Sequence, residues 1–233
     1  MSKKINNHDC RKEKCTSKIN FFQFLDDNDQ IKILEGIEHY VYAPGEKVLE
    51  KGESLDYVAI IEDGRAKLNR YDNKGNEHVL RFLNPGDIIG DQDIFEDHIM
   101  ESNAFAISPL KICRVRKKTL GSIVSYHPEF ASDLLSYFLD KIRSTNNKVW
   151  ILLSNNSLEM IAKFLLDQGK DSANIELTID DIASAINLRR ETVSRRLSLL
   201  QKYKVIKRKG HKQIQILDYD SLELIAFNDY DNV

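Results

Sequence analysis

The sequence predicts an α+β protein in which an all-β domain is followed by a long helix and a helical domain that ends in a β-hairpin. Three observations lead to this fold class. Glycine-punctuated apolar stretches run from Tyr42 to Ile112, a helical pattern of apolar residues covers about residues 129–153, and two short helices with a hairpin follow. At 233 residues the chain is long enough for two domains, each with its own core.

Composition excludes several classes of protein. With 42% hydrophobic and 30% charged residues, the chain is typical of an ordered protein. Its longest unbroken apolar run, residues 149–153, is far shorter than the roughly 20 residues that span a bilayer, and the polar N-terminus lacks a secretory signal. An odd count of three cysteines argues against a disulfide-stapled extracellular fold. We therefore expect a cytoplasmic protein with no membrane partner.

The N-terminal half is predicted to consist of an arm and a β domain. Residues 1–20 are polar and are expected to form a flexible arm, and residues 21–128 form the β domain. Glycines in this domain recur mostly at intervals of 7–12 residues, which is typical of the turns in an antiparallel sandwich or barrel. Residues 73–76 and 84–87 carry the residue types typical of tight turns.

Residues 129–153 are predicted to form one helix, roughly 37 Å long. Its apolar residues follow one another at steps of three and four, so they share one narrow face. The stripe consists of Leu134, Phe138, Ile142, Thr145, Val149 and Leu152. A stripe this narrow resembles the seam of a two-stranded coiled coil, so a dimerisation helix that makes a homodimer is favoured over packing on the chain's own β domain.

Residues 154–233 form the predicted C-terminal domain, which contains a helix-turn-helix. Thr178 and Asp181 match an N-terminal capping box, so a helix begins near residue 179. Asn187 tolerates the left-handed conformation of a sharp turn, and a second helix begins near Arg189. Its inward-facing residues are Val193, Leu197 and Leu200. Two short strands around residues 209–211 add the wing of a winged helix-turn-helix.

Basic charge is concentrated in residues 188–213, which hold ten Lys and Arg against one acid, Glu191. The segment therefore carries about +9, although the whole chain has a formal net charge of −2. A charge density of this kind on a helix-turn-helix predicts double-stranded DNA as the partner.

The residue types in this segment divide into two sets. Arginine reads guanine with two hydrogen bonds, glutamate accepts from the cytosine amino group, and serine leaves room for a thymine methyl. The predicted base-reading residues are Arg190, Glu191, Ser194 and Arg195. The predicted phosphate contacts are Thr178, Arg189, Arg196, Lys207, Arg208, Lys209 and Lys212. The alternative is a solvated helix in which Glu191 and Arg195 pair with each other.

Residues 190–195, Arg-Glu-Thr-Val-Ser-Arg, resemble the recognition helix of the CRP/FNR transcription regulators, and the resemblance extends over nearly the whole chain. It implies a cyclic-nucleotide-binding-like β-roll of the jelly-roll type, a long dimerisation helix and a winged helix-turn-helix, with RNA polymerase as a further partner. It also implies that Glu191 and Arg195 read the TGA core of each half of an inverted repeat. Ser194 favours an FNR-like TTGA element and Arg190 a CRP-like TGTGA element, and both remain open.

The same resemblance bears on cyclic nucleotides. In relatives that bind them, an Arg-Ser pair holds the phosphate, and residues 101–102 of this chain are Glu-Ser. Glu101 therefore stands where that arginine would be, and the surrounding stretch also carries Asp91, Asp93 and Asp97. Because like charges repel the phosphate, we expect no binding of cyclic AMP.

The three cysteines suggest control by thiol chemistry. Cys113 stands where FNR proteins keep the fourth cysteine of an iron–sulfur cluster, but the arm holds only Cys10 and Cys15, so a four-cysteine iron–sulfur cluster is not expected. His8-Asp9-Cys10 resembles the FLP subgroup of Gram-positive bacteria, which implies a Cys10–Cys113 disulfide switch with Cys15 as a competing or resolving thiol.

Two alternatives to the switch stay open. His8, Cys10, Cys15 and Cys113 together supply the ligand count of a zinc site. Alternatively, Cys113 is a small buried apolar residue and the arm thiols have no role.

An enzymatic function is not predicted. The six histidines are scattered, without the metal-binding motif of a cupin-type metalloenzyme, and no phosphate-binding loop or nucleophile elbow is present. A regulator that binds a small molecule in the β-roll remains as the alternative to redox control.

Overall fold

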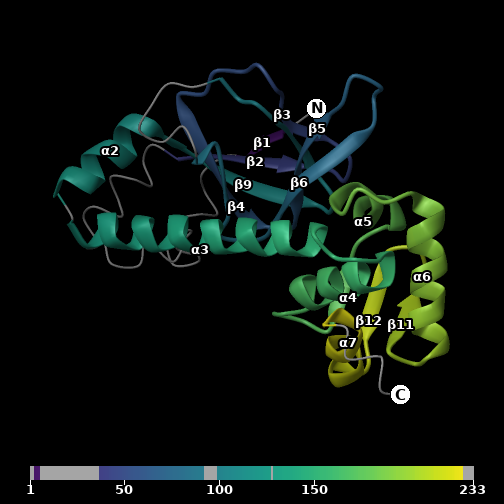
Figure 1. The fold of residues 1–233 in the computed structure, drawn as a ribbon. Helices are drawn as coiled ribbons and strands as arrows, with labels where there is room; N and C mark the ends of the chain where they lie inside the picture. The colour runs from purple at the N-terminus through teal and green to yellow at the C-terminus, as the bar shows by residue number, and fades with distance from the viewer. Residues whose placement is uncertain (1–2, 6–36, 92–98, 127, 228–233) are drawn as a thin grey trace. The chain divides into compact units, whose positions relative to one another are not determined.

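The computed structural model describes residues 3–5, 37–91, 99–126 and 128–227 of the chain (Figure 1). The chain divides into two compact units, Met1–Asp140 and Lys141–Val233. Strands dominate the first unit and helices the second, so the predicted α+β fold class is confirmed.

The first unit is built from two antiparallel sheets with strand orders β1-β2-β9-β4-β7 and β3-β8-β5-β6. The five-stranded sheet consists of β1 (Lys3–Ile5), β2 (Glu38–Tyr42), β9 (Leu110–Arg116), β4 (Tyr57–Asp63) and β7 (Ile88–Ile89). The four-stranded sheet consists of β3 (Lys47–Leu49), β8 (Asn103–Ala106), β5 (Ala66–Tyr71) and β6 (Glu77–Leu83).

The strand β1 lies inside the segment expected to be a flexible arm. It pairs with β2, from Lys3 opposite Val41 to Ile5 opposite His39. A strand at the edge of a sheet offers unpaired backbone groups to any segment, so the polarity of the arm did not reveal this pairing. The remainder of the arm, with His8, Cys10 and Cys15, lies outside the described residues.

The five-stranded sheet is covered on both faces. On one face, Ala59 and Ile61 pack into a core cluster that includes residues of the four-stranded sheet. On the other, Val58 and Ile60 pack with residues of α2 (Lys117–Tyr126) and α3 (Pro128–Leu152). A strand buried on both faces has no polar face, which explains why this part of β4 is an unbroken apolar run instead of an alternating pattern.

Both predicted tight turns are present. Between β5 and β6, the Asp72 carboxylate accepts hydrogen bonds from the backbone N–H groups of Lys74 and Asn76. Before β7, the backbone N–H of Asp87 donates to the carbonyl of Asn84 over 3.0 Å. The Asp87 carboxylate also accepts from the Asn84 backbone N–H over 2.8 Å, so the aspartate side chains of both turns act as expected from their turn propensity.

The predicted long helix is α3, but its predicted single stripe is wrong. Leu134 is buried and Phe138 partly buried, and both pack against the cluster that covers the five-stranded sheet. A different set of apolar residues is exposed on α3 and just beyond its end: Leu135, Leu139, Ile142, Val149, Trp150, Leu152 and Leu153. The predicted stripe combined residues from both faces, because apolar residues at adjacent positions allow two stripes with the same period.

The second unit consists of helices around a small antiparallel sheet of order β10-β12-β11. Its helices after α3 are α4 (Ser157–Gln168), α5 (Ile179–Ala185), α6 (Arg190–Lys202) and α7 (Tyr219–Ala226), and its strands are β10 (Asn174–Glu176), β11 (Ile206–Lys209) and β12 (Gln213–Ile216). The sequence analysis missed α7. Its sign was Asp218, whose carboxylate caps the helix by accepting from the Ser221 backbone N–H.

A buried ion pair lies within α4. Lys163 Nζ is 2.7 Å from Glu159 Oε1, and their side chains are only 7% and 5% exposed. The second carboxylate oxygen of Glu159 accepts from the Asn155 backbone N–H, and Lys163 Nζ lies 4.4 Å from the ring centroid of Trp150. Each charge is therefore compensated by the other and by a further contact, which a buried pair requires.

Replacing Lys163 by Met is expected to lower the free energy of unfolding of the second unit by about 3–5 kcal/mol, because Glu159 is left buried without its counter-charge. Removing both charges in Lys163→Met/Glu159→Gln is expected to restore most of the loss. Urea unfolding followed by the fluorescence of Trp150, the one tryptophan, measures the change. Lys170→Ala, which removes an exposed pair with Asp167, serves as control and should cost less than about 1 kcal/mol. Equal losses in the single and double variants would show that the pairing is not what stabilises α4.

Candidate functional site

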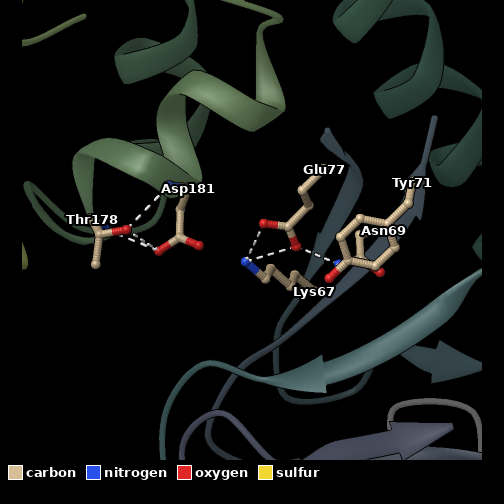
Figure 2. Close-up of polar contacts among 6 residues, drawn as sticks. All are labelled: Lys67, Asn69, Tyr71, Glu77, Thr178 and Asp181. Carbon is tan, nitrogen blue, oxygen red and sulfur yellow. Dashed lines mark hydrogen bonds and ion pairs between the residues drawn. The ribbon is translucent and has the colours of Figure 1, made fainter. Parts of the chain in front are cut away.

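The start of α5 is fixed by the predicted capping box (Figure 2). The Thr178 hydroxyl oxygen accepts from the Asp181 backbone N–H over 3.1 Å, and the Asp181 carboxylate accepts from the Thr178 backbone N–H over 3.1 Å. The Thr178 hydroxyl also donates to the same carboxylate over 2.6 Å. Two backbone donors at the helix terminus are thereby satisfied, which sets the direction in which α5 leaves the loop.

The turn between α5 and α6 has the predicted conformation. Asn187 has a φ of 54°, in the left-handed region that asparagine tolerates. The Leu188 backbone N–H then donates to the carbonyl of Ala183 over 3.0 Å, which closes the turn. The second helix, α6, begins at Arg190 with Arg189 as its N-cap residue.

One face of α6 is fully buried and the other is charged. Val193, Leu197 and Leu200 are each 0% exposed, as predicted. Arg190, Glu191 and Arg195 are exposed, and Ser194 is partly exposed. The apolar face fixes the rotation of the helix about its axis, so the four predicted base-reading residues are held on the outer surface.

The exposed charges of α6 differ in their partners. Arg190 Nη1 lies 3.1 Å from Asp180 Oδ2, in a pair that is more than half exposed and therefore weak. In the described part of the chain, Glu191 and Arg195 form no ion pair with each other. The alternative interpretation of a self-paired, solvated helix is therefore not seen in this structure.

Two of the seven predicted phosphate contacts are engaged within the protein. Arg196 Nε donates to the Ser157 hydroxyl of α4 over 2.9 Å. The Thr178 hydroxyl hydrogen is donated to Asp181, so a contact from this group to a phosphate oxygen would require that hydrogen bond to be replaced. Contact of Arg196 and Thr178 with DNA phosphates remains a prediction.

The other five predicted phosphate contacts lie at the N-cap of α6 and on the wing. Strands β11 and β12 form the hairpin, and Gly210 adopts a φ of 66° in its turn. The exposed residues are Arg189, Lys207, Lys209 and Lys212, and Arg208 is partly buried. The exposed face of α6 lies in the same unit as the cationic β11–β12 hairpin. This arrangement suits α6 in the major groove of DNA, with the hairpin near the sugar-phosphate backbone.

The region expected to repel cyclic nucleotides holds acids that are paired with arginines. Asp91 is buried and accepts from Arg81 Nη2 over 3.2 Å and from the Tyr137 hydroxyl over 3.0 Å. Exposed Glu101 pairs with Arg70. Asp93 and Asp97 lie outside the described residues. The negative charge expected from Asp91 and Glu101 is therefore partly compensated within the protein.

Strands β5 and β6 of the first unit carry a cluster of polar side chains (Figure 2). Lys67 Nζ forms an ion pair with Glu77 over 3.0 Å. Glu77 also accepts from the Asn69 side chain, which is 0% exposed and lies 3.5 Å from the Tyr71 hydroxyl. Lys67, Asn69 Nδ2 and Glu77 interact across two paired strands, so we assign the cluster a structural role, although Asn69 Oδ1 is buried without a hydrogen-bond partner among the described residues.

Cys113 lies in β9 with a thiol that is 0% exposed. Its Sγ is 3.4 Å from His39 Nδ1 and 3.7 Å from Glu62 Oε2. Burial, together with the Glu62 carboxylate, raises the pKa of the thiol well above its ordinary value. The thiol is thus held in its protonated, poorly nucleophilic form.

His39 and Glu62 were missed by the sequence analysis. The sign that could have found them is strand pairing, since β2 places His39 directly opposite Cys113 and β4 places Ile60 opposite it on the other side. Pairing of distant strands cannot be read from periodicity alone.

No helix in the described part of the chain is long and apolar enough to cross a membrane.

Comparison with known proteins separates the two units in the same way. Residues 40–127 match the family model of the cyclic nucleotide-binding domain, and residues 159–225 match that of the Crp-like helix-turn-helix domain. The chain is 26% identical over 186 residues to a CRP-like cAMP-activated global transcriptional regulator of Mycobacterium tuberculosis, a match that covers 76% of this chain and 83% of the relative.

Two further comparisons extend over most of the chain. The chain is 22% identical over 219 residues to the probable transcriptional regulator flp of Lacticaseibacillus casei, covering 91% of this chain and 98% of the relative. The structure of FixK2 from Bradyrhizobium japonicum superposes with a TM-score of 0.72 at 22% identity, covering 80% of this chain and 96% of that chain. The solved structure supports the fold.

Proposed function

Because the chain belongs to the CRP/FNR family of transcription regulators, with a cyclic-nucleotide-binding domain and a Crp-like helix-turn-helix, we propose that it reads an inverted repeat in double-stranded DNA as a homodimer. One observation carries the proposal. The face of α6 opposite its buried residues presents Glu191 and Arg195 to solvent, and neither makes an ion pair with a described residue.

The chemistry of these two side chains suits base recognition. A guanidinium donates two hydrogen bonds to guanine, and a carboxylate accepts one from the cytosine amino group. A carboxylate next to phosphates lowers non-specific affinity, so Glu191 is better explained by base recognition than by attraction to the backbone. Arg190 and Ser194 would select between the TGTGA and TTGA forms of the half-site, and the wing and Arg189 would hold the phosphates.

Homodimer formation would use the exposed face of α3. Leu135, Leu139, Ile142, Val149 and Leu153 follow one another at steps of four, three, seven and four, and Asn146 occupies the position that divides the step of seven. This is the heptad spacing of a two-stranded coiled coil. A two-fold axis between the helices would place two copies of α6 about one turn of DNA apart, which requires an inverted repeat.

Control of DNA binding is proposed to act through thiol chemistry and not through cyclic AMP. Glu101 stands where the resemblance places the arginine that holds the phosphate of a cyclic nucleotide, and its pair with Arg70 compensates its charge only in part. Cys113 with Cys10 or Cys15 would provide the dithiol, and RNA polymerase would be the further partner. Because Cys113 is buried and protonated, its oxidation requires access to the sulfur and is expected to be slow.

Arg195→Ala and Glu191→Ala are each expected to weaken binding to a TTGA-type inverted repeat by about 1–3 kcal/mol and to relax the preference among half-sites. Lys209→Ala is expected to weaken specific and random DNA alike and to reduce the salt slope by about one unit. Fluorescence anisotropy at several salt concentrations measures both effects. Lys111→Ala, an exposed lysine of β9, is the control. If Arg195→Ala lowers both affinities equally, the assignment of base reading is wrong.

The paired substitution Ile142→Glu/Val149→Glu is expected to convert the dimer to a monomer, because two helices cannot bring four carboxylates together in an apolar seam. Light scattering coupled to size exclusion gives the mass directly. Ser144→Glu adds a carboxylate on another face of the same helix and should leave the dimer intact. A dimer that survives the paired substitution would exclude this face as the interface.

Reversible oxidation is expected to change the affinity for the inverted repeat in step with the loss of two free thiols, and Cys113→Ser is expected to abolish the change. Anisotropy before and after dithiothreitol, with thiols counted on the same sample, makes the comparison. Added cyclic AMP is expected to leave the affinity unchanged. The same affinity before and after the loss of two free thiols would contradict redox control while leaving DNA recognition intact.

A further inference from the structure

We propose that His39, Glu62 and Cys113 form a binding site for one divalent transition-metal ion, of which zinc fits the ligands best, inside the five-stranded sheet. The site goes beyond the proposed function, which needs no metal, and it uses two ligands that differ from the arm residues considered for zinc from the sequence. It rests on the geometry of three adjacent strands within the first unit.

The sheet places the three side chains on one face. His39 of β2 and Cys113 of β9 are opposite each other in the strand ladder, so their side chains leave the sheet on the same side. On the other side of β9, the register of β4 shifts between Ile61 and Asp63, which leaves Glu62 at a bulge. Glu62 is two residues beyond Ile60, which lies opposite Cys113, so alternation along β4 places its carboxylate on the Cys113 side of the sheet, 3.7 Å from the sulfur.

The mutual distances match those of a tetrahedral site. Cys113 Sγ to His39 Nδ1 is 3.4 Å, Cys113 Sγ to Glu62 Oε2 is 3.7 Å, and His39 Nδ1 to Glu62 Oε2 is 3.6 Å. Zinc bonds of roughly 2.3 Å to sulfur and 2.0–2.1 Å to nitrogen and oxygen, at tetrahedral angles, separate the ligand atoms by roughly 3.3–3.6 Å. An ion can therefore enter with small adjustments of three side chains.

The charges also suit a divalent cation. A thiolate, a carboxylate and a neutral imidazole together carry two negative charges, so a bound Zn²⁺ gives a complex of zero net charge. A neutral complex suits this position because the surrounding cluster is apolar, with Val58, Ile60 and Val115 among its buried residues. Mixed sulfur, nitrogen and oxygen ligands favour zinc over calcium or magnesium.

Without a metal ion, the Cys113 thiol donates a hydrogen bond to the Glu62 carboxylate. Metal binding would break the S–H bond, release that proton to solvent and form the metal–sulfur bond. A fourth coordination position is left for water or another donor. Because the metal and a disulfide both require the Cys113 sulfur, a bound ion would exclude oxidation of that thiol.

The test is titration of the full-length, reduced, chelator-treated protein with Co²⁺, followed by competition with Zn²⁺. One equivalent of Co²⁺ is expected, with intense d–d bands of tetrahedral geometry and a sulfur-to-cobalt charge-transfer band. The affinity is expected to fall by more than about 100-fold in His39→Ala, Glu62→Gln and Cys113→Ser. Glu62→Gln retains size and polarity, so circular dichroism of this variant separates loss of metal from loss of fold.

Two controls identify the ligands. His78→Ala removes an exposed histidine that pairs with Asp72 and should leave Co²⁺ binding unchanged. Cys10→Ser/Cys15→Ser should also retain one equivalent. Absence of the charge-transfer band in the wild type, an unchanged Co²⁺ affinity in Glu62→Gln, or loss of the band only in the arm double variant would each overturn the proposal. Anisotropy with DNA on the same samples shows separately whether DNA recognition is intact.

Discussion

The structure of the first unit depends on burial of both faces of the five-stranded sheet. Val58, Ala59, Ile60 and Ile61 of β4 are each at most 1% exposed, and they alternate between two core clusters. A shift of register by one residue would exchange the two sets of side chains, so the register of β4 on β9 is strongly constrained. That constraint places Ile60 opposite Cys113 and brings Glu62 within reach of the sulfur.

In the second unit, burial of apolar residues likewise fixes the orientation of a helix, α6. Burial of Val193, Leu197 and Leu200 fixes which side of α6 faces outward, and the capping box and Asn187 fix where its partner α5 begins and ends. The charged residues are held in place by apolar packing that they do not take part in. Base-reading side chains can therefore vary without loss of the fold, since their own contacts within the protein are few and exposed.

How far the sequence predicts the structure depends on the range of the interactions. The capping box, the turn at Asn187 and the wing are set by residues within a few positions of one another, and all three were predicted correctly. The stripe on α3 was wrong because Leu134 and Leu135 both fit a helical period, and only packing against the sheet selects which one is buried. His39 and Glu62 were missed because they meet Cys113 across 74 and 51 residues of sequence, through strand pairing that no local pattern encodes.

Because of where Cys113 lies, either metal binding or disulfide formation by its sulfur would affect the packing of α3. The thiol belongs to the same buried cluster as Phe130 and Leu134 on the first part of α3. A bond formed by the sulfur therefore acts first on the packing beneath that helix, and close-packed cores transmit such changes because they have little free volume. A metal ion would tie β2, β4 and β9 together at this point, and a disulfide to Cys10 or Cys15 would use the same sulfur. Either bond would therefore act on the core beneath α3, the helix that also carries the exposed heptad face on which dimer formation is proposed.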